Sequence, residues 1–119
     1  YRVTTYRDGP GNHEFDIVLM SKKEDKAILL EVKHSKAFDP VHQARHLFDA
    51  DACKDFEAHT GMQIAGKGVV YRGDTRYYAA GIHYLHVDAL LEHPKECIQM
   101  LQNSWDSHIR KTERNPIEH

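Results

Sequence analysis

Two neighbouring apolar segments with charged residues at fixed positions constrain most strongly what this chain can fold into. Residues 14–19 and residues 27–33 each have the length and the apolar content of a β-strand. The second segment ends in Glu31-Val32-Lys33. Because side chains alternate along a strand, Glu31 and Lys33 should emerge on one face and Val32 on the other. The sequence therefore predicts two adjacent strands, the second ending in a pair of opposite charges.

Asp16, in the first of these strands, is expected to point inward and to join Glu31 and Lys33. Two carboxylates and one amine at one place are typical of a divalent-metal site, here for Mg²⁺ or Mn²⁺. The carboxylates of Asp16 and Glu31 would be metal ligands, and the backbone carbonyl of Val32 could add another oxygen. Lys33 would lie beside a phosphate group, orient a water molecule and stabilise negative charge in the transition state. The expected chemistry is phosphodiester hydrolysis.

The remaining apolar patterns and turn residues predict an α/β domain with a central mixed β-sheet flanked by helices. Asp39-Pro40 is a favourable helix start and Gly61 a helix stop. An amphipathic stripe on the last helix is expected to pack on the sheet; it consists of Ile98, Leu101, Trp105 and Ile109. We expect strands over residues 1–7, 13–21, 27–34, 67–72 and 77–85, and helices over residues 40–60, 87–91 and from Pro94 onward. Residues 1–93 would form the core, and residues 94–119 a terminal helix and tail packed on it or extending from it.

Length and composition limit the class of protein. A chain of 119 residues suits one domain with a modest core. The net charge of −2 does not indicate nucleic-acid binding by the molecule as a whole. No signal peptide and no run of 18 apolar residues occurs, so we expect a cytoplasmic domain without membrane contact. Cys53 and Cys97 are expected to be reduced thiols. The chain begins inside a predicted strand and without Met, as expected of a piece of a longer protein.

Four motifs in order resemble the PD-(D/E)xK nuclease superfamily, in the form found as the C-terminal domain of prokaryotic AAA-type ATPases. The resemblance covers about residues 10–93. The motifs are Glu14-Phe15-Asp16-Ile17-Val18, Glu31-Val32-Lys33-His34-Ser35, Gly68-Val69-Val70-Tyr71-Arg72-Gly73-Asp74 and Leu85-His86-Val87-Asp88-Ala89-Leu90-Leu91. The superfamily usually has a helix with a further acidic residue before the first strand, and none is visible here.

The resemblance implies a restriction-endonuclease-like sheet and a magnesium-dependent nuclease that binds nucleic acid. The nucleic acid it implies is DNA. Asp16 matches the first acidic position, and Glu31 and Lys33 match Glu-x-Lys. It also implies an N-terminal ATPase domain in the same chain and a homodimer. From the residues themselves, Glu14 could be a third carboxylate of the same cleft, and Gln43 could reach substrate from the following helix.

Several alternatives stay open. Asp16, Glu31 and Lys33 could form ordinary cross-strand ion pairs on an exposed face. The fold could equally be a non-catalytic protein-interaction or regulatory module. A zinc enzyme would require His42 and His46, at i and i+4 on the predicted helix, to meet another ligand. A further set of residues could stack on single-stranded nucleic acid or simply line amphipathic strands; it comprises Tyr71, Tyr77, Tyr78 and Tyr84, with Arg72 and Arg76.

Overall fold

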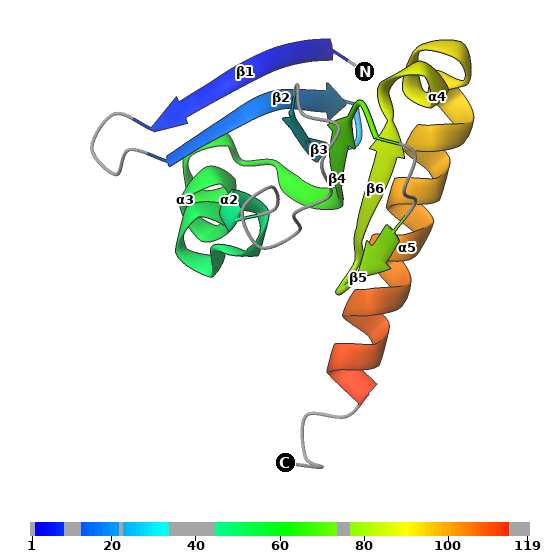
Figure 1. Ribbon diagram of the computed structural model, residues 1–119. Helices are drawn as coiled ribbons and strands as arrows, with labels where there is room; N and C mark the ends of the chain where they lie inside the picture. The colour runs from blue at the N-terminus through cyan, green and yellow to red at the C-terminus, as the bar shows by residue number, and fades with distance from the viewer. Residues whose placement is uncertain (1, 9–12, 22, 34–44, 74–76, 115–119) are drawn as a thin grey trace.

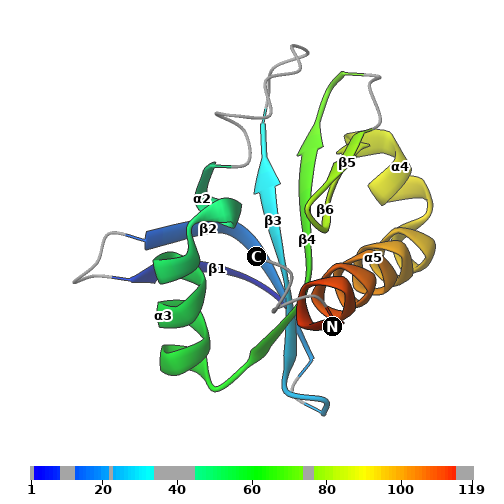
Figure 2. The ribbon, with the colours of Figure 1, turned by 90° about the horizontal axis from the view of Figure 1, so that it is seen from below.

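Six strands form one mixed sheet with helices on both faces (Figures 1 and 2). The computed structural model describes residues 2–8, 13–21, 23–33, 45–73 and 77–114. The strands are β1 (Arg2–Asp8), β2 (His13–Ser21), β3 (Lys26–Val32), β4 (Gln63–Tyr71), β5 (Tyr77–Ala79) and β6 (Ile82–His86). The helices are α2 (Arg45–Phe48), α3 (Ala50–Thr60), α4 (Val87–Glu92) and α5 (Pro94–Arg114). None of these helices has the length and apolar composition needed to cross a membrane.

The strand order is β1-β2-β3-β4-β6-β5. The first three strands form an antiparallel meander. β4 then lies parallel to β3, and β6 parallel to β4, while β5 pairs antiparallel with β6 at the other edge. The predicted α/β class with a mixed central sheet flanked by helices is confirmed.

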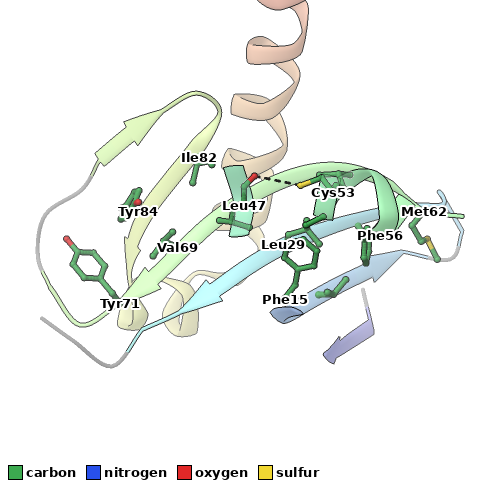
Figure 3. Packing of buried hydrophobic residues seen from close by; sticks show 14 residues of the cluster. Phe15, Leu29, Leu47, Cys53, Phe56, Met62, Val69, Tyr71, Ile82 and Tyr84 are labelled. Atoms are coloured by element: carbon green, nitrogen blue, oxygen red, sulfur yellow. Dashed lines mark hydrogen bonds between the residues drawn. The ribbon is translucent and has the colours of Figure 1, made fainter. Parts of the chain in front are cut away.

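The sheet separates two hydrophobic clusters. One cluster lies under α2 and α3 and contains Phe15, Leu29, Leu47, Phe56 and Tyr84 among others (Figure 3). The other lies under α4 and α5 and is built around Ile28, Leu30 and Leu101. β3 contributes to both, which explains its almost continuous apolar sequence.

The prediction of one continuous helix over residues 40–60 is wrong. Its start at Asp39-Pro40 lies outside the described residues, and the part from Arg45 onward consists of two helices. Asp49 separates them, because its backbone is extended and its side chain accepts hydrogen bonds from the N–H groups of Asp51 and Ala52 at the start of α3. The predicted stop is confirmed: Gly61 has φ 70° and donates its N–H to the Glu57 carbonyl.

The predicted strand over residues 77–85 is a hairpin. β5 and β6 are joined through Ala80 and Gly81, both with positive φ, of 51° and 82°. Two residues with positive φ form the tight turn whose twist matches that of the paired strands. This turn reverses the chain in the middle of the apolar run.

α5 packs closely on β4 through two glycines. A Cβ atom at Gly66 would lie 3.2 Å from the main chain of Leu101, and one at Gly68 would lie 3.0 Å from its Cδ2. Leu101 is fully buried, as predicted, but the end of the predicted stripe is wrong: Ile109 is exposed. The helix thus belongs to the sheet along its first part and leaves it near its end.

Candidate functional site

A bulge in β2 directs Asp16 toward β3. The two strands pair in antiparallel register as far as Ile17 and Leu30, and one further step of this register brings Asp16 opposite Glu31. On its other side, β2 changes register against β1, so that Asp16 and Ile17 together lie opposite Thr5. Such a bulge redirects a side chain. The predicted inward orientation of Asp16 is therefore wrong. Its side chain is exposed and reaches sideways to the edge of β3 instead of into the core.

The Asp16 carboxylate replaces a main-chain acceptor at the end of β3. Its Oδ2 accepts a hydrogen bond of 2.9 Å from the N–H of Val32. The N–H and C=O of one residue in an extended strand point to the same side, so the Val32 carbonyl faces the same space. On the opposite side, Lys33 donates its N–H to the Val70 carbonyl of β4 at 2.9 Å. Both flanks of the Glu31–Lys33 segment are thus held by hydrogen bonds.

Glu31 is the buried member of the cluster. Its side chain is only 2% exposed, although it carries a carboxyl group. Lys33 Nζ lies 3.8 Å from Glu31 Oε2, and the Lys33 side chain is 36% exposed. The ammonium therefore extends from the buried carboxyl to solvent, where it could meet a substrate.

The pKa of Glu31 is raised from 4.5 to about 8, and burial of the carboxyl group is the largest cause. The negative charge of Asp16 and a hydrogen bond between the two carboxyl groups act in the same direction, whereas Lys33 and, more weakly, Arg45 act to lower this pKa. Desolvation outweighs the two cations. Near neutral pH the Glu31 carboxyl group therefore keeps its proton, at the place where a cation would be expected.

The donor atoms at this place fit a hard divalent cation. Asp16, Glu31 and the Val32 carbonyl offer oxygen only, which is the ligand type that Mg²⁺ and Mn²⁺ prefer. Within the described part of the chain, no group of three or more His, Cys, Asp or Glu side chains gathers to hold a metal. Two carboxylates would leave several coordination positions to water and phosphate, as is usual for Mg²⁺.

The other predicted site residues are not described at the level of side chains. Glu14 is in β2, but only its backbone is described, and the same holds for His46 in α2. Gln43, His34 and His42 lie outside the described residues. Their proposed roles as a third carboxylate, a substrate contact or zinc ligands stay predictions.

The aromatic residues are less available than one alternative required. Tyr71 and Tyr84 are buried, with their rings edge to face and their centroids 6.2 Å apart. They pack in the core under α2 and α3 and cannot stack on a nucleic-acid base from there (Figure 3). For Tyr77 and Tyr78 only the backbone is described, and Arg76 lies outside the described residues.

Sequence reasoning missed Lys67, a lysine buried in the middle of β4. Its side chain is 7% exposed, and Nζ donates a 2.7 Å hydrogen bond to the Leu47 carbonyl at the end of α2. Nζ also lies 4.5 Å from the centroid of the Trp105 ring. A signal was present in the sequence, since a cation inside an apolar strand is costly unless it has a partner.

Comparisons of the chain with models of protein families, with characterised proteins and with solved structures gave no significant match.

Proposed function

We propose that this domain hydrolyses phosphodiester bonds of nucleic acid with the help of Mg²⁺ or Mn²⁺. One observation supports this most: the Asp16 carboxylate, bound to the Val32 N–H, lies against a buried Glu31 whose other neighbour is the Lys33 ammonium. A carboxyl buried at the end of a central strand is costly for folding. An ordinary surface ion pair would not explain this burial, whereas a cation bound between the two carboxylates would offset its cost.

In this proposal each residue has a separate task. Asp16 and Glu31 hold the cation through carboxylate oxygens, and the Val32 carbonyl provides a further oxygen. A divalent cation bound there would supply positive charge against the scissile phosphate. The Lys33 ammonium donates hydrogen bonds to the attacking water and to a phosphate oxygen, orienting the first and stabilising the charge that develops on the second.

The wider context follows from the resemblance of the sequence motifs and belongs to the proposal. The domain would act in the cytoplasm as the C-terminal part of an AAA-type ATPase. DNA would be its nucleic acid, and two copies would form a homodimer. Glu14 and Gln43 would contribute to the same cleft as weaker substrate contacts.

A non-catalytic interaction module is the second candidate. It is favoured by the net charge of −2 and by the pair of carboxylates, rather than three, among the described side chains. Such a module would keep the sheet and use its surface to dock the ATPase or another protein.

Calorimetric titration with Mn²⁺ separates the two candidates. We expect binding by the wild-type chain and none by Asp16→Ala or Glu31→Ala. Glu24→Ala serves as the matched control, because Glu24 is exposed in the turn at the other end of the same strands. The same samples are then incubated with plasmid DNA, single-stranded DNA and RNA in Mn²⁺.

Cleavage that disappears in both variants but persists in the control would support the nuclease. Binding of Mn²⁺ without cleavage of any of these substrates would support a metal site in an interaction module. A folded wild-type chain that binds no Mn²⁺ would contradict the proposed metal-dependent hydrolysis.

A further inference from the structure

The single-turn helix α2 lies against β2, the strand that carries Asp16. It begins at Arg45, packs against β2, and places Leu47 in the cluster under α2 and α3 (Figures 2 and 3). A helix of four residues is not stable by itself and depends on contacts with the rest of the molecule. What fixes α2 therefore also fixes Arg45.

Lys67 supplies such a contact from inside the sheet. Its ammonium donates to the Leu47 carbonyl at 2.7 Å, and the thiol of Cys53 approaches the same oxygen at 3.7 Å. The ring of Trp105, on α5, covers the ammonium at 4.5 Å from the ring centroid. A buried cation with two such partners is a costly way to fill a core. The burial of the Lys67 ammonium is explained if the protein requires α2 to be held in one position.

Arg45 is the residue whose position depends on this anchor. Its side chain is exposed, and its helix packs against β2, the strand that carries Asp16, on the face of the sheet where Leu47 meets Phe15 and Leu29. Lys33 and the arginine of α2 thus belong to the same face of the sheet, and both cations reach solvent. A guanidinium matches the geometry of a phosphate group with two parallel hydrogen bonds.

We propose that Arg45 binds a backbone phosphate of the nucleic acid at this site, and that Lys67 positions Arg45 by anchoring α2. This inference rests on the proposed function, since it assigns a phosphate contact to the same cleft. Arg45 touches substrate in it, whereas Lys67 acts only through α2.

Binding of a fluorescently labelled DNA oligonucleotide by the full chain, followed by anisotropy at several salt concentrations, tests the role of Arg45. Ca²⁺ replaces Mg²⁺ so that binding is measured without cleavage. Arg45→Ala is expected to weaken binding about tenfold and to lower the slope of log K against log salt concentration by about one phosphate contact. Arg45→Lys should keep the slope and lose part of the affinity. Arg110→Ala, an exposed arginine near the end of α5, is the matched control and should change neither.

The role of Lys67 is tested with two variants and a double-mutant cycle. Lys67→Met removes the donor to the Leu47 carbonyl and should lower the salt slope as Arg45→Ala does. Lys67→Gln keeps a donor and should restore the slope, even if both variants unfold at a lower temperature. In combination with Arg45→Ala, Lys67→Met should cause little further loss of affinity. A purely structural lysine would change the unfolding temperature and leave the slope unchanged.

The outcomes distinguish this inference from the proposed function. If Arg45→Ala binds DNA like the wild type while Asp16→Ala loses Mn²⁺, the inference is overturned and the metal site stands. If Lys67→Met and Lys67→Gln both keep the wild-type slope, the positioning role is overturned. A wild-type chain that binds Mn²⁺ but no oligonucleotide overturns the phosphate contact, and one that binds neither overturns both proposals.

Discussion

At the scale of the residue, Glu31 should make the free energy of unfolding depend on pH. Its pKa is near 4.5 in an unfolded chain and about 8 in the folded one. Between these values the folded state keeps a proton that the unfolded state has lost. The free energy of unfolding should therefore fall as the pH rises from about 4.5 to about 8, and Glu31 should add no further change above that.

Replacement of Glu31 by glutamine should remove this pH dependence of the free energy of unfolding. At pH 9 we expect Glu31→Gln to be more stable than the wild type by on the order of 5 kcal/mol, because each unit between the unfolded and folded pKa of Glu31 corresponds to about 1.36 kcal/mol. At pH 4 the two should be nearly equal. Urea unfolding at both pH values measures the difference, with Glu24→Gln as control. A stability gain of the same size at both pH values would contradict the assignment of the raised pKa to Glu31.

At the scale of the element, Asp49 divides what the sequence presents as one helix. Asp49→Ala should destabilise the protein by about 1 kcal/mol, because two N–H groups at the start of α3 lose their acceptor. Asp51→Ala, which removes an exposed acid from the same first turn, should cost about half as much or less. Thermal unfolding of the two variants checks the ranking, and an equal cost would show that charge near the helix start matters more than the cap.

The contact between α5 and β4 offers a second test at this scale. Gly66→Ala and Gly68→Ala should each cost about 1–3 kcal/mol by overpacking. The two substitutions should differ in their energetic coupling to Leu101→Ala. The closest contact at Gly68 is with the end of the Leu101 side chain and should be relieved in a double variant with Leu101→Ala, while the 3.2 Å contact with the Leu30 side chain remains. At Gly66 the clash includes the Leu101 main chain and should remain. Double-mutant cycles by urea unfolding measure both couplings, and equal couplings would be inconsistent with this packing.

The sequence predicted most elements and part of the site, and its errors have physical causes. Strong alternation and the start at Pro94 located β2 and α5 well, because these signals are local. The break at Asp49 was missed because a helical run and a capping aspartate look alike without tertiary contacts. The hairpin at Ala80-Gly81 was missed because two small residues do not interrupt an apolar run. The burial of Lys67 depends on Leu47 and Trp105, which are distant in sequence, and the bulge at Asp16 depends on pairing with β1.

At the scale of the whole molecule, the carboxylate pair lies where the three parallel strands end. β3, β4 and β6 run in the same direction, and the carboxyl ends of parallel strands are the usual position of ligand sites in open α/β sheets. The position of Asp16, Glu31 and Lys33 in the fold therefore agrees with a binding role, independently of their chemistry.

Binding of a cation there should stabilise the whole fold, and more so at high pH. At the proposed site Mn²⁺ would bind the folded state and would have to displace the proton of Glu31. We expect Mn²⁺ to raise the unfolding temperature of the wild type more at pH 9 than at pH 6, and to leave Glu31→Gln unchanged at both. Differential scanning calorimetry with Mn²⁺ or with a chelator measures this. A shift that is the same at both pH values would argue against a ligand that competes with a proton.

The position of Trp105 makes the chain its own optical probe. It is the single tryptophan of the sequence. Its indole N–H donates to the Ile64 carbonyl, in the part of β4 that precedes the pairing with β6, and its ring faces the ammonium that holds α2. The fluorescence emission maximum of an indole responds to nearby charge, so a movement of Lys67 would shift the emission maximum of Trp105. Spectroscopy on the unlabelled protein can therefore follow, in real time, whether α2 shifts when a ligand binds at the carboxylate pair.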